Sequence, residues 1–423
     1  MRIIIANYRY FVAGGPERYM IKFMDIAQRN GIECIPFTVD YEENIPSEYS
    51  KYFVSPRGDR RETQYENIKK TPAAVWRMLN STIYNFEAKR KLRKLIRDTK
   101  PDCVYIIHEI NSLSPSIIDA AKAEGVRVVH RISDFFLVCA NRMLMNGGEV
   151  CDACVSGCLK PALQTRCVKN SIAATYTRVF AMKVHRALQI FQKVDAWVVP
   201  SAFTRKVIAR NGLDEERFFH VPTFIDATVI QPSYLNDGSV LFLGRISPEK
   251  GVIYAIRAMN RLKDTGLVLK ITGTPDPIAD QNLLDYISEN GLSDRVQFVG
   301  FQSGDALKEL IRNAICIVCP AIWYENMPNT VVESYAYGKP VVASRLGSLA
   351  EIVEDGKTGF LFEPKNDEEM ADKLRTLYNN PEMVIDMGRC ARKKCEEEYN
   401  ENLHFDRVIA HLKGDAVVAR NKK

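Results

Sequence analysis

The sequence lacks any long uncharged apolar segment. Its 423 residues are 46% hydrophobic and 26% charged, as in globular proteins, yet no stretch approaches the roughly 18 to 20 apolar residues that a helix needs to cross a bilayer. The opening MRIIIANYRYF is too short and too charged at its far end for a signal peptide, and it predicts a first β-strand. We therefore expect a cytosolic protein, with two domains because the chain is too long for one ordinary core.

A disulfide framework and a dinucleotide fingerprint are also missing. Four of the eleven cysteines, Cys34, Cys103, Cys316 and Cys319, stand singly in apolar segments, where a thiol acts as a small hydrophobic side chain. Gly-x-Gly-x-x-Gly is absent, although Gly14 and Gly15 follow the first predicted strand. Two glycines before a helix let the backbone approach a phosphate or an acceptor closely. A tight turn without a ligand is the alternative.

Residues 317–345, which read IVCPAIWYENMPNTVVESYAYGKPVVASR, predict a buried parallel strand, a loop, a helix from Asn329 and a second strand. Glu325 lies on the loop and Glu333 lies one turn into the helix. In open α/β sheets, ligands bind at this carboxyl end of the strands. Two glutamates eight residues apart are common on solvated helices, so the strand and loop around them carry the prediction.

This arrangement suits a nucleotide sugar. The helix start offers unpaired N–H groups to a diphosphate, Glu333 can accept hydrogen bonds from ribose, and Glu325 can hold hydroxyls of the transferred sugar. In SVLFLGRISPEKGV, Arg245 and Lys250 meet another helix start. These cations can stabilise a leaving diphosphate without a divalent metal, so we expect no cofactor for catalysis. Two unrelated surface cations are the plain alternative.

These motifs resemble the Glu-x7-Glu and Gly-Arg…Glu-Lys-Gly elements of the retaining glycosyltransferases of family 4. The resemblance implies an α/β protein with two Rossmann-like, doubly wound parallel-sheet domains facing across a cleft, called the glycosyltransferase B fold. A C-terminal helix is expected to cross back to the first domain. The implied catalytic residues are Arg245, Lys250 and Glu325. The implied donor site consists of Gly15, Arg245, Lys250, Glu325, Asn326, Met327, Asn329, Thr330 and Glu333.

The domain boundary is expected near Pro222, in a segment rich in Pro and Gly. The resulting units are an acceptor-binding domain over 1–222, a donor-binding domain over 223–400, and a closing helix and tail over 401–423. The first domain includes a cysteine-rich insertion over 139–167.

On the acceptor side, the resemblance implies Gly14, Gly15, His108 and Asp134. Many family members end the strand corresponding to VRVVHRI with a His-Asp pair, but here Ser133 takes the place of the histidine. His130 is three residues earlier, and an odd offset in a strand points to the opposite face. We therefore assign no catalytic histidine, since packing or capping explains His108 and His130 almost as well.

Five cysteines cluster in the insertion, at positions Cys139, Cys151, Cys154, Cys158 and Cys167. A structural zinc site built from Cys151, Cys154, Cys158 and Cys167 is one interpretation. Thiols or disulfides that hold an irregular loop are the other. Both stay open from the sequence.

The net charge of +6 is modest, and we expect no nucleic-acid partner. Residues 51–100, however, hold fourteen Lys or Arg against five Asp or Glu. The segment 86–97 predicts an amphipathic helix that is either solvated or rests on anionic lipid. A second long helix, over about 171–193, is predicted to bury a stripe formed by Ile172, Tyr176, Val179, Phe180, Val184, Leu188 and Phe191.

We interpret the sequence as a retaining glycosyltransferase that moves a sugar from a nucleoside diphosphate to a glycan. The resemblance favours a hexose-like sugar, a lipid-linked acceptor, a role in cell-surface polysaccharide synthesis, and a position in the cytoplasm or peripherally on the inner face of the membrane. A nucleotide-sugar epimerase of the same fold and a non-catalytic docking partner are the alternatives.

Overall fold

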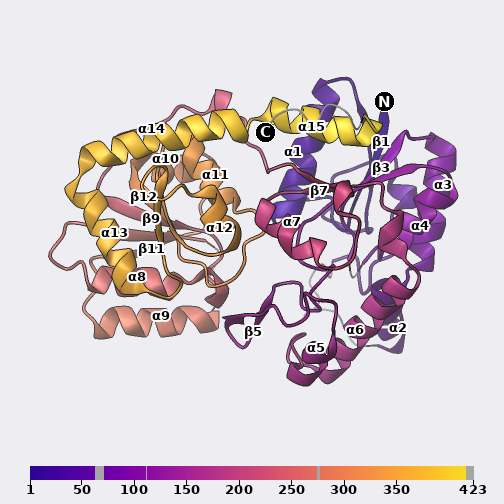
Figure 1. The fold of residues 1–423 in the computed structure, drawn as a ribbon, viewed down its shortest axis with the longest axis horizontal. Helices are drawn as coiled ribbons and strands as arrows, with labels where there is room; N and C mark the ends of the chain where they lie inside the picture. The colour runs from indigo at the N-terminus through magenta and orange to yellow at the C-terminus, as the bar shows by residue number, and fades with distance from the viewer. Residues whose placement is uncertain (62–70, 111, 274–276, 416–423) are drawn as a thin grey trace.

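The computed structural model describes residues 1–61, 71–110, 112–273 and 277–415. In this part of the chain, two α/β units each surround a six-stranded parallel sheet. Figure 1 shows the two units side by side. The predicted pair of doubly wound domains is confirmed.

The first sheet has the order β2-β1-β3-β4-β7-β8. Helices cover both faces of a parallel sheet, so its central strands are apolar throughout, as in β1, where Ile3, Ile4 and Ile5 are fully buried. A two-stranded hairpin, β5 and β6, stands apart from it. The strands are β1 (Arg2–Asn7), β2 (Glu33–Phe37), β3 (Cys103–His108), β4 (Arg127–Arg131), β5 (Met145–Asn146), β6 (Glu149–Val150), β7 (Ala196–Val199) and β8 (Phe218–His220).

Within the described residues of this unit, four helices begin where a side chain accepts a hydrogen bond from an N–H group of the first turn. Asn85 accepts a hydrogen bond from the N–H of Ala88 at 3.0 Å, and Ser171 accepts one from Ala174 at 3.3 Å. The helices are α1 (Gly15–Arg29), α2 (Pro72–Ile83), α3 (Phe86–Thr99), α4 (Ser116–Ala123), α5 (Lys160–Thr165), α6 (Ile172–Ala187) and α7 (Ala202–Ala209), with short turns η1 (Ser50–Tyr52), η3 (Ile190–Lys193) and η4 (Glu215–Arg217).

The second sheet has the order β11-β10-β9-β12-β13-β14. Its strands are β9 (Ser239–Leu243), β10 (Val268–Thr272), β11 (Val296–Gly300), β12 (Ala314–Cys319), β13 (Val341–Ser344) and β14 (Gly359–Phe362). Its helices and turns are η5 (Ala227–Val229), η6 (Pro248–Lys250), α8 (Val252–Asn260), α9 (Pro277–Glu289), α10 (Gly304–Asn313), α11 (Asn329–Ala336), α12 (Gly347–Ile352), α13 (Asp367–Asn379) and α14 (Pro381–Glu398).

The segment 317–345 folds as the sequence predicts. It contains the second half of β12 (Ala314–Cys319), a loop, α11 and β13 in that order. The predicted inner face of α11 is buried, with Val331, Val332, Tyr335 and Ala336 all at 1% exposure or less.

The last helix, α15 (Glu401–Lys413), returns to the first unit, as predicted. Figure 1 shows α14 and α15 along one side of the molecule, α14 over the second unit and α15 over the first. Arg127 Nε on β4 donates to the carbonyl of His411 at 2.9 Å, and Arg29 on α1 pairs with Glu401 at 2.7 Å. The C-terminal helix therefore links the two units.

The first sheet ends at His220 and the second begins at Ser239. The predicted boundary near Pro222 falls between them and stays a prediction. None of the helices in the described part of the chain is both long enough and apolar enough to cross a bilayer.

The prediction for residues 171–193 is wrong in two respects. The α-helix ends at Ala187, because Gln189 takes a left-handed conformation with φ of 49°. Most of the expected buried stripe also faces outward, since Ile172, Tyr176 and Phe180 are 53%, 58% and 56% exposed, and Leu188 is 50% exposed. The buried face instead carries Thr175, Arg178, Val179, Ala181, Met182 and His185.

The other amphipathic helix, α3, buries Leu92, Leu95 and Ile96 as predicted. Several of its cations have partners within the protein. Arg93 and Arg97 both pair with Glu124, at 2.6 and 2.9 Å. Glu124 thus offsets part of the positive charge of residues 51–100 within the first unit.

Candidate functional site

The loop after β12 places the Glu325 carboxylate in contact with the Lys250 amine. Glu325 Oε1 accepts hydrogen bonds from Lys250 Nζ at 2.6 Å and from the indole N–H of Trp323 at 2.9 Å. The side chains of Lys250 and Glu325 are 24% and 13% exposed. Two of the three predicted catalytic residues are therefore in direct contact, although they lie 75 positions apart in the chain.

Gly251 makes this contact possible. Its φ is +70°, and a Cβ placed on it would lie 1.9 Å from the carbonyl oxygen of Pro320 at the end of β12. A side chain at this position would push η6, and with it Lys250, away from the loop that holds Glu325. The glycine of the Glu-Lys-Gly motif is thus required by close backbone approach.

Arg245 follows β9 and reaches outward. Its NH2 donates to Glu249 Oε1 at 3.0 Å, and the hydroxyl of Ser247 donates to the same oxygen at 2.8 Å. The Arg245 side chain is 65% exposed, so it can turn toward a bound anion at little cost.

Glu333, the predicted ribose ligand, faces the first unit across the cleft. Arg18 NH1 on α1 donates to Glu333 Oε1 at 3.2 Å. Beside this pair, a Cβ placed on Gly15 would lie 3.7 Å from the side-chain nitrogen of Asn329. The two helix starts, α1 and α11, thus face each other. Sequence reasoning missed Arg18, whose only signal is its position one turn after Gly15.

Three other predicted donor residues already have protein partners. The side chain of Asn326 accepts a hydrogen bond from Thr204 at 2.8 Å and donates to the carbonyl of Ile132 at 3.0 Å, which ties this loop to the first unit. Met327 packs against the core of the second unit, and the hydroxyl of Thr330 donates to the carbonyl of Leu243 at 3.3 Å. Their side chains are therefore occupied, and these residues can contact a nucleotide-sugar donor through their backbone groups.

That backbone is suited to an anion. Among the described residues, the N–H groups of Asn329 and Thr330 have no hydrogen-bond acceptor, as expected for the first turn of a helix. The positive end of the α11 dipole points the same way. A diphosphate at this place would meet unpaired donors, with Lys250 on the adjoining loop.

On the acceptor side, His108 and Asp134 lie together at the carboxyl ends of neighbouring strands. His108 Nε2 donates to Asp134 Oδ2 at 3.1 Å, and Arg142 NH1 donates to the same oxygen at 3.2 Å. Burial by itself would raise the pKa of Asp134, but the Arg142 guanidinium and the His108 hydrogen bond outweigh burial and lower that pKa to about 2. Arg142 is the second site residue that the sequence did not single out.

Several polar atoms near this edge are buried without a partner in the described part of the chain. They are Asn7 Oδ1, His108 Nδ1, Glu17 Oε1 and Glu109 Oε1. The ring of Tyr8 lies 5.0 Å from that of His108. Burial, followed by the Glu17 carboxylate, raises the pKa of Tyr8 to about 12. Because native proteins pair most buried polar atoms, such a group of unpaired atoms is typical of a ligand-binding edge.

His130, the other candidate histidine, is a packed residue. Its ring is fully buried, with Nε2 bonded to Glu109 at 2.8 Å and Nδ1 bonded to the carbonyl of Arg131 at 2.9 Å. The geometry therefore separates the two histidines, and only His108 lies beside Asp134.

The cysteine-rich insertion shows free thiols. Cys139, Cys151, Cys154, Cys158 and Cys167 are all unpaired, and burial raises the pKa of Cys167 to about 11. Within the described ranges, no three His, Cys, Asp or Glu side chains are grouped as ligands of a metal ion would be. The zinc interpretation stays a prediction without geometric support.

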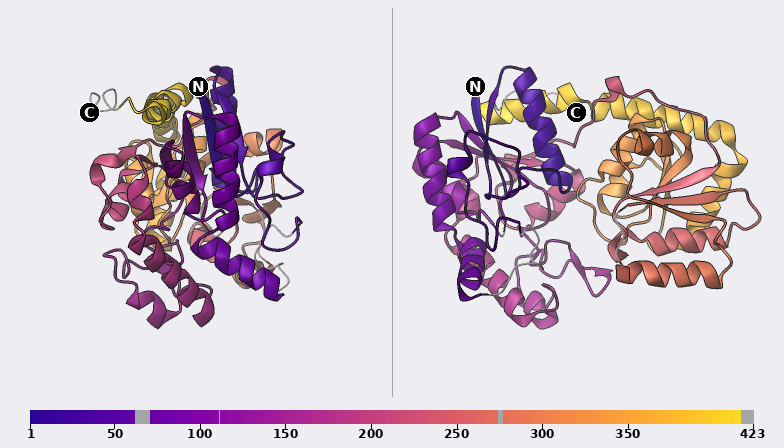
Figure 2. Two further views of the ribbon diagram at one scale, coloured as in Figure 1. Left: turned by 90° about the vertical axis from the view of Figure 1, so that its right-hand side faces the viewer. Right: turned by 180° about the vertical axis from the view of Figure 1, so that it is seen from behind.

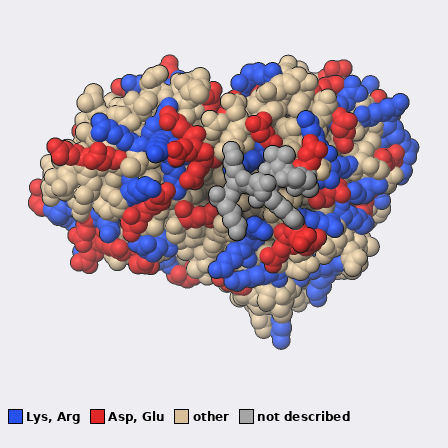
Figure 3. Space-filling model, turned by 45° about the horizontal axis from the view of Figure 1, so that its top comes forward, with Lys and Arg blue, Asp and Glu red and all other residues tan. Residues whose placement is uncertain are grey.

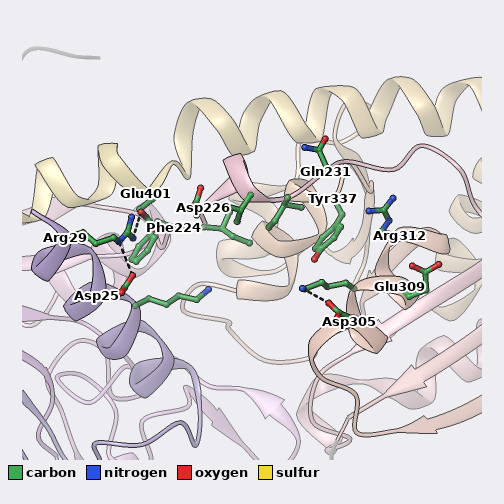
Figure 4. Close-up of a pocket in the computed structure, with 15 residues that line it drawn as sticks. Asp25, Arg29, Phe224, Asp226, Gln231, Asp305, Glu309, Arg312, Tyr337 and Glu401 are labelled. Atoms are coloured by element: carbon green, nitrogen blue, oxygen red, sulfur yellow. Dashed lines mark hydrogen bonds and ion pairs between the residues drawn. The ribbon is translucent and has the colours of Figure 1, made fainter. Parts of the chain in front are cut away.

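A cavity of about 710 Å³ lies between the two units, near the start of α15 (Figure 4). Its wall combines α1, the linker after Phe224, α10 and Tyr337. Asp25 and Arg29 point into it from one side, and Asp305 and Arg312 come from the other (Figure 4). None of the predicted donor residues lines it, and its charges are of both signs, so we do not place the donor there.

Two family profiles together match nearly the whole chain. The profile described as "Glycosyltransferase Family 4" matches residues 13–229, and the profile described as "Glycosyl transferases group 1" matches residues 228–394.

Curated relatives match in part. A D-inositol 3-phosphate glycosyltransferase of Paenarthrobacter aurescens is 29% identical over 206 residues, which cover 45% of this chain and 50% of the relative. An alpha-D-kanosaminyltransferase of Streptomyces kanamyceticus is 33% identical over 169 residues, which cover 40% of this chain and 44% of the relative. The chain thus spans about half the length of these relatives.

Solved structures match over the full chain. Sucrose-phosphate synthase from Thermosynechococcus elongatus has a TM-score of 0.72 at 17% identity and covers 98% of both chains. The Anabaena protein HepE, solved in complex with UDP-glucose, has a TM-score of 0.65 at 15% identity and covers 98% of this chain and 100% of its own. These likenesses confirm the glycosyltransferase B fold.

Proposed function

Because the chain belongs to glycosyltransferase family 4, we propose that it transfers a sugar from a nucleoside diphosphate to a hydroxyl of a glycan acceptor, with retention at the anomeric carbon. The observation that carries this proposal is the contact of Lys250 with Glu325 beside the open first turn of α11. An amine, a carboxylate and unpaired N–H groups within one loop suit a sugar attached to a diphosphate.

In the proposed complex, the diphosphate lies against the N–H groups of Asn329 and Thr330, with Lys250 and Arg245 beside it. Glu333 accepts hydrogen bonds from ribose, and Arg18 holds the other side of that carboxylate. The complexes of HepE with UDP and with UDP-glucose support a nucleotide-sugar donor.

The proposed reaction proceeds by attack of the acceptor hydroxyl on the face that the diphosphate leaves. The bond from the anomeric carbon to the diphosphate breaks, the bond to the acceptor oxygen forms, and the departing phosphate takes the proton. Arg245 and Lys250 stabilise the charge that develops on the diphosphate. Glu325 orients the sugar, and no side chain is assigned as a base.

The proposed acceptor is a lipid-linked glycan of cell-surface polysaccharide synthesis, reached from the inner face of the membrane. Its hydroxyls would meet His108, Asp134 and the backbone of Gly14 and Gly15. The unpaired Nδ1 of His108 can accept a hydrogen bond from such a hydroxyl.

The test incubates the purified chain with a panel of nucleotide sugars, with and without a membrane lipid extract, and measures released nucleoside diphosphate. We expect one donor to release its nucleotide only when the extract is present, with a labelled sugar appearing in the lipid fraction. Interconversion of sugars without the extract would instead identify an epimerase. No reaction with any donor would favour a non-catalytic docking partner.

A further inference from the structure

Helix α6 has an exposed apolar stripe. Ile172, Tyr176 and Phe180 are spaced four residues apart, so they lie one above the other on the same side of the helix. Each exposes more than half of its side chain. Ordinary soluble surfaces scatter single apolar residues, whereas a continuous apolar stripe marks an interaction surface.

Neighbouring helices add exposed apolar residues beside α6. α2 and α5 both pack on α6, and His185 Nε2 of α6 bonds to the carbonyl of Ile83 at the end of α2 at 2.7 Å. On α2, Trp76 is 70% exposed and Val75 is 40% exposed. Figures 1 and 2 show the three helices together at the end of the first domain farthest from α15. We call their exposed side the α2/α6 face.

The charge of this face has one sign. The sequence has no Asp or Glu from position 153 to 194, and none in α2. The exposed cations of the three helices and the segment between α5 and α6 are Arg77, Lys160, Arg166, Lys169 and Lys183. Elsewhere the surface differs, since Figure 3 shows Lys and Arg interspersed with Asp and Glu over the side near α14 and α15.

We propose that the α2/α6 face rests on an anionic lipid bilayer, with Trp76, Tyr176 and Phe180 at the level of the headgroups. Aromatic side chains prefer this level, and cations around them meet lipid phosphates. The occupant is lipid rather than protein because α2, α5, α6 and the segment between α5 and α6 carry cations and no Asp or Glu, which complements a uniformly negative surface.

The position of α6 connects this surface with the acceptor side of the cleft. On the buried face of the helix, Arg178 NH2 donates to the carbonyl of Phe136 at 3.4 Å, in the loop that also holds Asp134 and Arg142. Only the thickness of one helix, about 10 Å, separates that loop from the exposed stripe. The inference rests on the proposed lipid-linked acceptor, whose glycan would reach Asp134 while its lipid stays in the bilayer.

The test is cosedimentation of the full chain with vesicles, without donor. Vesicles of phosphatidylcholine with about one third phosphatidylglycerol should bind the wild type, binding should fade with added salt, and pure phosphatidylcholine should bind weakly. The double variant Tyr176→Ser, Phe180→Ser should lose about tenfold or more in partitioning. Lys183→Gln should lose about fivefold.

Two exposed positions elsewhere serve as matched controls. Leu235 is 80% exposed in the linker, and Arg90 lies on the exposed side of α3. Leu235→Ser and Arg90→Gln should stay within about twofold of the wild type. A larger loss for Arg90→Gln than for Lys183→Gln would place the lipid contact on α3 and overturn the inference.

Absence of vesicle binding at low salt would also overturn it. So would unchanged vesicle binding by the double variant. If the wild type is a dimer in solution and that variant is a monomer, the stripe binds a second copy of the chain instead. Binding to vesicles without any sugar transfer would contradict the proposed function alone, and transfer to a soluble acceptor without vesicle binding would contradict this inference alone.

Discussion

Lys250 and Trp323 both donate to the same oxygen of Glu325. Within the described residues, the second oxygen, Oε2, has no hydrogen-bond partner, so it is available to a sugar hydroxyl. When a diphosphate arrives, Lys250 can contact it with another of its three N–H bonds while keeping Glu325. The amine of Lys250 thus has two roles. It holds the Glu325 carboxylate, which orients the sugar, and it stabilises the charge that develops on the departing diphosphate.

Replacing Lys250 by Ala should lower kcat by about 10² to 10³, equivalent to about 2.7 to 4 kcal/mol. The melting temperature should change little, since the pair is only partly buried and such pairs contribute little to folding. Steady-state transfer and thermal unfolding check the two statements. Lys393→Ala, at a lysine that is 74% exposed on α14, is the matched control. A kcat within threefold of wild type for Lys250→Ala would remove this lysine from the mechanism.

Gly251 allows a second residue-level test. Gly251→Ala places a methyl group 1.9 Å from the Pro320 carbonyl at a φ of +70°, and we expect a loss of about 3 kcal/mol in the free energy of unfolding from strain and overpacking. Gly212→Ala has a similar φ of +74° with nothing within 4 Å, so it should lose only about 1 kcal/mol. Equal losses in urea unfolding would show that close backbone approach is not what this glycine provides.

At the scale of elements, the packing of α15 against the first domain depends on a buried neutral histidine, His404. His404 Nδ1 donates to the carbonyl of Pro222 at 2.6 Å, and Nε2 accepts from the hydroxyl of Tyr19 at 2.9 Å. Burial lowers the pKa of His404 to about 3. The contacts of α15, the helix that links the two domains, therefore include a histidine whose protonation is unfavourable in the folded protein.

The sign of the pH effect follows from this shift. The unfolded chain takes up the proton near pH 6.5 and the folded chain only near pH 3, so the stabilisation is complete above 6.5 and is lost as the pH falls toward 3. Between pH 7 and pH 5 this site should remove about 2 kcal/mol from the free energy of unfolding.

His404→Gln should lack the part of the pH dependence that comes from His404. Urea unfolding of wild type and variant at pH 7 and pH 5 therefore measures how much His404 contributes to the change in the free energy of unfolding. Two other buried histidines, His185 and His411, have pKa values lowered to about 4 and titrate in both proteins. An identical change in stability for wild type and variant would contradict the assignment.

Helix α6 shows what periodicity leaves undetermined. Its apolar residues form two faces, one with Val179 and Met182 and one with Tyr176 and Phe180. The helical spacing of three or four residues fits either face as the core. The buried face also carries Arg178 and His185, because carbonyls of distant segments accept their hydrogen bonds. Those acceptors cannot be identified from the helix's own sequence.

Over the whole molecule, the donor side was predictable because its determinants are local. Glu325 and Glu333 lie in one stretch, and Arg245 and Lys250 lie in another, each with its own strand and helix start. The fold followed from the same alternation of strands and helices.

The contacts across the cleft were not predictable. Arg18 and Glu333 lie 315 positions apart, and Asn326 reaches a carbonyl 194 positions away. Nothing local in the sequence indicates such partners, so Arg18 and Arg142 escaped notice and His108 could not be told from His130. Sequence patterns predicted which edge of each sheet binds ligands. Only the assembled structure shows which residues of the two domains contact each other across the cleft.

The central claim is that the second domain holds a nucleoside diphosphate between Lys250, the start of α11 and Glu333. We would test it first by thermal unfolding with a panel of nucleotides and nucleotide sugars, for wild type, Glu333→Ala and a control, Glu397→Ala, at an exposed glutamate of α14. A ligand at about 100 times its dissociation constant should add about 2.7 kcal/mol of stability. We predict that one class of nucleoside diphosphate stabilises wild type and Glu397→Ala but not Glu333→Ala. Equal stabilisation of all three proteins, or none by any nucleotide, would contradict the account.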